Sequence, residues 1–106
     1  MRTSLVLFLA LCGGAQAALA AQPISADDAS AALEIAKASD CLSCHSLTEK
    51  IVGPAYSKVA EKYTDDKDAV SSLVQSIQYG SKGKWGRIPM PAHAALSAEE
   101  LTLLSR

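Results

Sequence analysis

The chain has 106 residues, with ten basic and eleven acidic side chains and a formal net charge of −1. This balance excludes the strongly basic face of a nucleic-acid-binding domain, so we expect no nucleic-acid partner. One Phe, one Trp and three Tyr offer little aromatic material for a core. A single domain of this size has a thin interior and usually needs a metal, disulfides or a cofactor to complete it.

The first stretch of the chain is typical of a secretory signal peptide. Arg2 supplies a positive start, residues 5–11 form an apolar run, and residues 18–20 (Ala-Leu-Ala) have the form of a cleavage site. We predict a cleaved signal peptide over residues 1–20, with cleavage after Ala21 or Ala17 as the alternatives. One domain, residues 21–106, then remains, with a net charge of −2. The apolar run is too short to span a bilayer, so we expect no stable membrane anchor.

Helical periodicity begins after the predicted signal peptide. A first helix is predicted over about residues 26–39, with Asp27 and Asp28 in its first turn, where the helix dipole favours acidic side chains. This helix should end where a group of cysteine and histidine residues begins.

Residues 41–45 (Cys-Leu-Ser-Cys-His) form the C-x-x-C-H pattern that attaches a c-type haem. Two thiols at this spacing can add to the two vinyl groups on one porphyrin edge, and the adjacent histidine can bind the iron. A thioredoxin-like dithiol is one alternative, but it expects a βαβ context that is missing from this pattern. A structural zinc site is the other. It wants four ligands, and apart from Cys41, Cys44 and His45 the exported chain offers only His93.

Two further helices are predicted after a turn at residues 53–54 (Gly-Pro). The first covers about residues 55–63, with Tyr56, Val59 and Tyr63 at helical spacing. The second covers about residues 66–79 and is amphipathic. Its apolar stripe consists of Val70, Leu73, Val74 and Ile77.

A glycine-rich loop over residues 80–86 leads to Met90, which lies between Pro89 and Pro91. Met90 is the only methionine outside the predicted signal peptide, and the two prolines stiffen its loop. A thioether is a weak ligand that is best held by the protein, so Met90 is our candidate for the second axial iron ligand. Core packing is its alternative role. His93 is the competing ligand, although we interpret it as a solvated loop residue.

The last predicted helix begins at Ser97, where Glu100 three residues later completes a capping box. No segment of the chain shows a convincing strand pattern. The fold class is therefore predicted to be all-α.

Over residues 26–106 the chain resembles the small bacterial class I cytochromes c. The resemblance rests on four features in the same order, which are the haem motif, residues 53–54, Trp85-Gly86 and residues 89–91. The resemblance is greatest to the short periplasmic type that donates electrons to nitrite reductases and terminal oxidases. It implies a cytochrome c fold of four to five short helices around one covalently bound haem c with its iron. It also implies a periplasmic monohaem electron carrier that is a monomer and not an enzyme. Its partners would be redox proteins, namely a reductase, an oxidase or a quinol-oxidising complex.

The resemblance also implies roles for particular residues. Cys41 and Cys44 would form the thioethers, and His45 and Met90 would bind the iron. The carbonyl of Pro54 would accept the ring N–H of His45, which fixes the orientation of the imidazole. The indole N–H of Trp85 would reach a haem propionate.

Two positions depart from the family pattern. Asp40 precedes the haem motif where a helix-ending glycine is common, and the final helix stops at Arg106, about one turn early. The second departure indicates either a shortened helix or a truncated sequence.

A six-coordinate iron has no open position for a substrate, so the predicted function is outer-sphere transfer of single electrons through an exposed haem edge. The alternative is a haem enzyme, or a gas-binding or sensor protein, with an open or displaceable sixth ligand. A subunit that holds haem without exchanging electrons is a third interpretation. Lysines near the haem-bearing segments could steer an acidic partner or could be scattered surface charges. These are Lys37, Lys50, Lys82 and Lys84.

Overall fold

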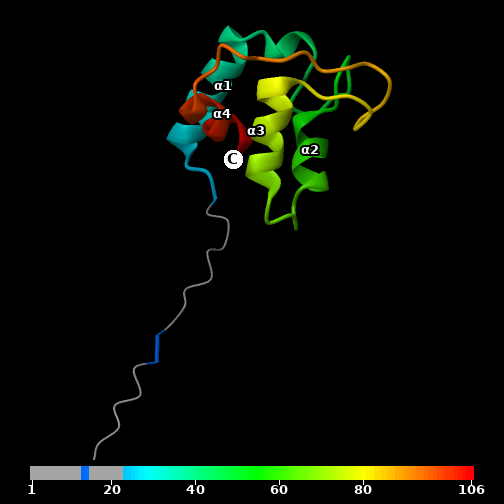
Figure 1. Ribbon diagram of the computed structural model, residues 1–106. Helices are drawn as coiled ribbons and strands as arrows, with labels where there is room; N and C mark the ends of the chain where they lie inside the picture. Colours follow the sequence, from blue (N-terminus) through cyan, green and yellow to red (C-terminus); the bar gives the residue numbers. More distant parts are fainter. Residues whose placement is uncertain (1–12, 15–22) are drawn as a thin grey trace, which may run out of the picture.

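The computed structural model describes residues 13–14 and 23–106, so nearly all of the predicted signal peptide and its cleavage site lie outside the described residues. The described chain is helical (Figure 1). Its elements are α1 (Ala26–Ala38), the short 3-10 helix η1 (Cys41–Ser43), α2 (Tyr56–Lys62), α3 (Ala69–Tyr79) and α4 (Ala98–Ser105). Within the described residues the only extended pairing is an isolated antiparallel bridge between Ser81 and Met90. The predicted all-α class is confirmed.

Serine side chains cap the two helices that carry most of the core. Ser97 Oγ accepts the backbone N–H of Glu100 at 3.2 Å, and Glu100 Oε2 accepts the N–H of Ser97 at 2.8 Å. The predicted capping box is therefore complete at the start of α4. At the start of α1, Ser25 Oγ accepts the N–H of Asp28 at 3.1 Å. Each such cap stabilises its helix by about 1 kcal/mol.

Helix α3 begins at Ala69, three residues later than the spacing predicts. The carboxylate of Asp66 accepts the N–H of Asp68 at 2.8 Å, and the Asp66 carbonyl accepts the N–H of Ala69 at 3.1 Å. Residues 66–68 therefore form a turn, because a short acidic side chain competes for the backbone donors that a first helical turn would leave free.

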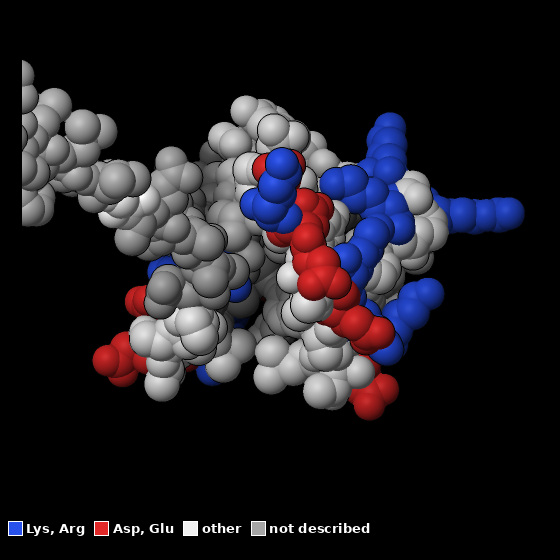
Figure 2. Space-filling view, turned by 90° about the horizontal axis from the view of Figure 1, so that it is seen from below, with Lys and Arg blue, Asp and Glu red and all other residues white. Residues whose placement is uncertain are grey.

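Seen from below, acidic side chains form a band across the molecule, with basic side chains gathered beside it (Figure 2).

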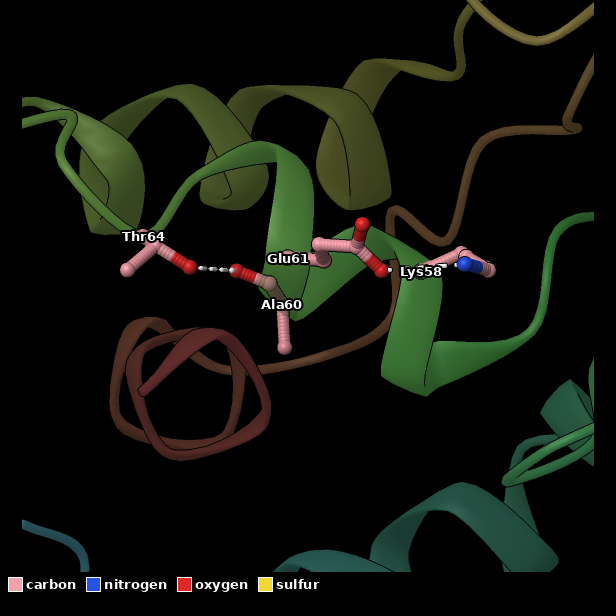
Figure 3. A network of polar contacts seen from close by, with 4 residues as sticks. All are labelled: Lys58, Ala60, Glu61 and Thr64. Carbon is pink, nitrogen blue, oxygen red and sulfur yellow. Dashed lines mark hydrogen bonds and ion pairs between the residues drawn. The ribbon is translucent and has the colours of Figure 1, made fainter.

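Local contacts stabilise α2 (Figure 3). Thr64 Oγ1 donates to the carbonyl of Ala60 at 2.9 Å and so satisfies one acceptor at the end of the helix. Lys58 and Glu61 form an exposed ion pair at 3.0 Å, which contributes at most about 0.5 kcal/mol. Among the described elements, no other helix brings a Cα atom within 8 Å of α2. The protein part of the fold therefore holds α2 mainly through the segments on either side of it.

The buried core lies where α4 packs against both α1 and α3. Leu101 of α4 and Ala36 of α1 are 1% and 2% exposed, and Arg106 Nη1 pairs with Asp28 Oδ2 at 3.3 Å between the same two helices. Helix α4 thus packs against α1 although it ends at Ser105. Among the described residues, Leu101 is the only large side chain that is fully buried. The expectation of a thin protein interior is confirmed.

Asp40 links α1 to η1 in the left-handed conformation, with φ of 59° and ψ of 21°. It is the only residue other than glycine with positive φ in the described part of the chain. Its side chain makes no capping hydrogen bond to η1. Asp40 therefore adopts the backbone geometry of a helix-ending glycine, which explains why glycine is common at this position in the family.

Replacing Asp40 by glycine is expected to raise the free energy of unfolding by about 0.5 kcal/mol, because glycine adopts the left-handed conformation without a steric cost. The gain is reduced by the greater freedom of glycine in the unfolded chain. Guanidinium unfolding of the haem-loaded protein measures the change. Asp40→Ala is the matched control and should destabilise the protein, since alanine lacks the tolerance of aspartate for this conformation. A destabilised glycine variant would contradict the prediction.

Candidate functional site

A cavity of about 440 Å³ opens between α2, α3 and the two loops that follow the haem motif and α3. Ligand sites typically enclose roughly 300–1,000 Å³. Apolar side chains from the two predicted helical stripes face this space. They are Tyr56, Val59 and Tyr63 from α2 and its end, and Leu73 and Ile77 from α3. Apolar side chains of α2 and α3 therefore line the cavity, as expected for a domain whose core is completed by an apolar cofactor.

The structure brings the predicted site residues to this one cavity. Its lining includes Cys44, His45, Pro54, Trp85 and Met90. Cys41 lies one turn before the lining residues, in η1, and is buried. Both cysteines are free thiols. The N–H groups of Cys44 and His45 donate to the Cys41 carbonyl at 3.2 Å and 2.9 Å, so a tight turn sets the spacing of the motif.

Three neighbouring residues fix the His45 ring. Nδ1 of His45 lies 2.7 Å from the carbonyl of Pro54, which is the contact that the family resemblance implied. Because a carbonyl only accepts, Nδ1 carries the hydrogen and Nε2 is left with a free lone pair. The Tyr56 ring stacks on His45 with centroids 5.0 Å apart and planes at 17°. A Cβ on Gly53 would lie 2.8 Å from Cε1 of His45.

Sequence reasoning missed Gly53 and Tyr56 as parts of the site. The sequence pattern predicts only a turn at Gly53 and only a place in an apolar helical stripe for Tyr56. Their position within two residues of Pro54 is the available signal, since residues close in sequence to a contact with the His45 ring can also lie near that ring. The resemblance pointed to Pro54, but not to the packing of its neighbours.

Gly53→Ala is expected to destabilise the haem-loaded protein by about 1–3 kcal/mol, because the added methyl group must displace the His45 ring. Thermal unfolding of the holoprotein checks the size of the effect. Ser57→Ala is the control, since Ser57 is exposed on the same segment and a surface change of this kind stays within about 0.5 kcal/mol. Equal unfolding temperatures for the two variants would contradict the close packing of Gly53 against His45.

Two ionisable groups at the haem motif, the Cys41 thiol and the Tyr56 hydroxyl, are neutral. Burial raises the pKa of the Cys41 thiol, an effect partly offset by its hydrogen bond with Tyr56. Burial also raises the pKa of Tyr56 far above its ordinary value. Both groups are therefore neutral near pH 7 in the chain before haem attachment, which suits an apolar ligand.

Backbone contacts hold Met90 at the cavity. The N–H of Met90 donates to the Ser81 carbonyl at 2.8 Å, and the N–H of Ser81 donates to the Met90 carbonyl at 3.1 Å. Gly80, at φ of 82°, allows this approach, since a Cβ there would lie 2.6 Å from the Met90 carbonyl oxygen. Met90 is therefore fixed by pairing with the start of its own loop, in addition to the two prolines beside it.

His93 does not line the cavity. Its backbone N–H donates to the Ile77 carbonyl at 2.9 Å, which draws this part of the loop onto α3, and its Nδ1 is buried without a hydrogen-bond partner. His93 therefore lies in a loop, as interpreted, but it is half-buried rather than fully solvated. The structure also gives no support to a zinc site, because no group of three or more His, Cys, Asp or Glu side chains in the described chain is placed to hold a metal.

Trp85 forms part of the cavity wall and is 38% exposed. Lys62 Nζ lies 4.6 Å from the centre of the Trp85 ring. This cation–π contact links the end of α2 to the glycine-rich loop and contributes about 0.5–1 kcal/mol at an exposed position.

An all-α domain with an apolar cavity, a C-x-x-C-H turn at that cavity and a proline-flanked methionine on another loop defines the class of c-type haem proteins. The family model for cytochrome c matches residues 29–105, and the chain belongs to this family. The predicted cofactor, a covalently bound haem c with its iron, is thereby confirmed, as is the prediction of an electron carrier that is not an enzyme.

Individual relatives agree with this assignment. The chain is 49% identical to cytochrome c-551 of Pseudomonas denitrificans over 70 residues, which is 66% of this chain and 85% of the relative. It is 40% identical to cytochrome c-552 of Nitrosomonas europaea over 77 residues, or 73% and 75% of the two chains. The crystal structure of wild-type Nitrosomonas europaea cytochrome c552 aligns with a TM-score of 0.67, at 40% identity, over 69% of this chain and 90% of that chain. The predicted resemblance to small class I bacterial cytochromes c and the predicted fold are confirmed.

Proposed function

We propose that this cytochrome c is a periplasmic carrier of single electrons whose iron is bound by His45 and Met90. The observation that carries the proposal is the meeting of these two residues, from separate loops, at one apolar cavity. When bound, the haem supplies an iron that alternates between Fe(II) and Fe(III). Cys41 and Cys44 would hold it through thioether bonds.

The surrounding residues would tune this iron. The hydrogen bond from Nδ1 of His45 to the Pro54 carbonyl orients the imidazole and increases its basicity toward a metal at Nε2. A methionine ligand favours the reduced iron and raises its potential. The apolar walls from α2 and α3 keep water out, which also disfavours the more highly charged oxidised state.

The rim of the cavity offers a contact surface for a redox partner. Ile51, Val52 and Ile88 line the cavity and are also 50%, 46% and 67% exposed. Electron-transfer complexes use small interfaces that allow rapid release. Figure 2 shows a band of acidic side chains with most of the basic side chains along one edge of it, an uneven distribution that can orient an approaching partner. We therefore propose a monomer that meets a reductase, an oxidase or a quinol-oxidising complex only briefly.

Export is the second part of the proposal. The predicted signal peptide over residues 1–20 supports a periplasmic location, where c-type haem is attached in bacteria. None of the helices in the described part of the chain has the length and apolar character needed to cross a membrane.

The purified, exported protein tests the proposal. We expect an intact mass equal to residues 21–106 plus one haem, and reversible oxidation and reduction by one electron. The oxidised protein should show the weak long-wavelength band of methionine-to-iron charge transfer. A high-spin spectrum would contradict Met90 ligation and favour an enzyme or gas-binding protein. A colourless protein would contradict haem binding altogether.

A further inference from the structure

The charged side chains of the cavity are all of one sign. Lys50, Lys84 and Arg87 line it, whereas its lining contains no Asp or Glu. The remaining walls are mainly apolar. A cavity of this kind suits a ligand with an apolar body and anionic groups at its edge, because the three cations are exposed at its rim and can form charge-assisted hydrogen bonds there.

Lys84 is held in a defined position among these cations. Its Nζ donates to Ser76 Oγ at 2.9 Å, and Ser76 Oγ lies 3.1 Å from the carbonyl of Ser72, one turn earlier in α3. The hydroxyl of Ser76 donates its single hydrogen to the Ser72 carbonyl. Its oxygen therefore accepts the hydrogen bond from the Lys84 ammonium group. Two of the three donors of Lys84 are left for another acceptor.

The neighbouring residue adds a further donor. Trp85 follows Lys84 in the chain and lines the same cavity, and its indole has an N–H donor but no acceptor. Lys62, stacked on the Trp85 ring, increases the positive charge nearby. Lys82 lies only two residues from Lys84 but does not line the cavity. The loop thus presents two similar lysines in different settings.

We propose that Lys84, positioned by the Ser76 hydroxyl, binds a carboxylate of the cofactor, namely a propionate of the haem. The inference rests on the proposed function, since it requires haem in this cavity. It assigns Lys84 to cofactor binding rather than to steering a partner. By neutralising a negative charge close to the iron, Lys84 raises the reduction potential.

Two matched variants of the haem-loaded protein separate binding from general charge. Lys84→Met and Lys82→Met each remove one positive charge from the same loop. We expect Lys84→Met to lower the midpoint potential clearly more than Lys82→Met does. It should also shift the NMR signals of one haem propionate, which Lys82→Met should leave in place. Lys84→Arg keeps the charge and the donors, so it should restore most of the wild-type potential.

Ser76→Ala provides a second test that keeps the charge of Lys84. Without its acceptor, Lys84 loses its fixed position, and we expect a smaller shift of the same propionate signals and of the potential. Equal potentials for the Lys84→Met and Lys82→Met variants, or unchanged propionate signals in Lys84→Met and Ser76→Ala, would overturn this inference while leaving the electron carrier intact. A wild-type protein without haem would instead overturn the proposed function itself.

Discussion

Replacing both Cys41 and Cys44 by alanine is expected to give a protein whose haem is extracted completely by acidified acetone, whereas the wild-type haem resists extraction. The two residues are free thiols joined by one tight turn at the cavity. No other cysteine lies in residues 21–106, so thioether bonds could not form elsewhere in the exported chain. Extraction followed by intact mass measurement checks the result.

The same double variant should lose most of its stability. With the cofactor released, the walls of a cavity of about 440 Å³ face water, and the protein core that remains is centred on Leu101 alone. A native domain is stable by only about 5–15 kcal/mol, and we expect the free energy of unfolding to fall close to zero. Circular dichroism measures the lost helix. The single variants are controls, since each keeps one thiol and should retain part of its haem covalently. Extraction-resistant haem in the double variant would contradict the assignment.

Replacing Met90 by alanine is expected to leave the covalent haem in place and to lower the midpoint potential by about 0.2 V, a fraction of the roughly 0.8 V range that axial ligands set. The sulfur donor, which favours reduced iron, is lost, and water or another weak ligand can enter. Potentiometric titration measures the shift. The charge-transfer band of the oxidised protein should disappear with it.

Two companion variants separate ligation from packing. Met90→Leu preserves volume but removes the sulfur, so it should lower the potential as much as alanine does while costing less stability. His93→Ala should leave the potential nearly unchanged, because His93 does not line the cavity. An unchanged midpoint in Met90→Ala would remove Met90 from the ligand set, and a large fall in His93→Ala would place His93 in it.

Local sequence signals predicted the fold well wherever short-range contacts decide the outcome. The capping box at Ser97 and the acidic first turn of α1 depend on residues a few positions apart, and both are present. The start of α3 was predicted three residues early, because the hydrogen bond from Asp68 to the Asp66 carboxylate competes with helix formation. Hydrophobic periodicity predicts which residues share a helix face, but it does not predict where a side chain competes with the first helical turn.

For the site, too, local patterns are predictable from the sequence, whereas contacts that depend on packing are not. The haem motif is a local pattern, and the structure places its residues at a cavity together with Met90. The contacts of Gly53 and Tyr56 with His45 depend on packing, which composition and spacing do not encode. The partial burial of His93 has a similar cause, because a backbone hydrogen bond to Ile77 draws its loop onto α3, and its Nδ1 atom is buried. Lys84 and Lys82 are equivalent in the sequence pattern, and the hydrogen bond of Lys84 to Ser76 distinguishes them in the structure.

The isolation of α2 bears on what a bound porphyrin adds to the fold. No Cα atom of another described helix comes within 8 Å of α2, whereas α4 contacts both α1 and α3. Helix α4 therefore joins α1 and α3 into one unit through protein contacts, whereas α2 has no helical neighbour among the described elements. The contacts of α2 are with loop residues, as in the stacking of Tyr56 on His45 and the contact of Lys62 with Trp85. Since α2 also lines the cavity, a porphyrin there would give this helix the broad apolar contact that the other helices find in α4.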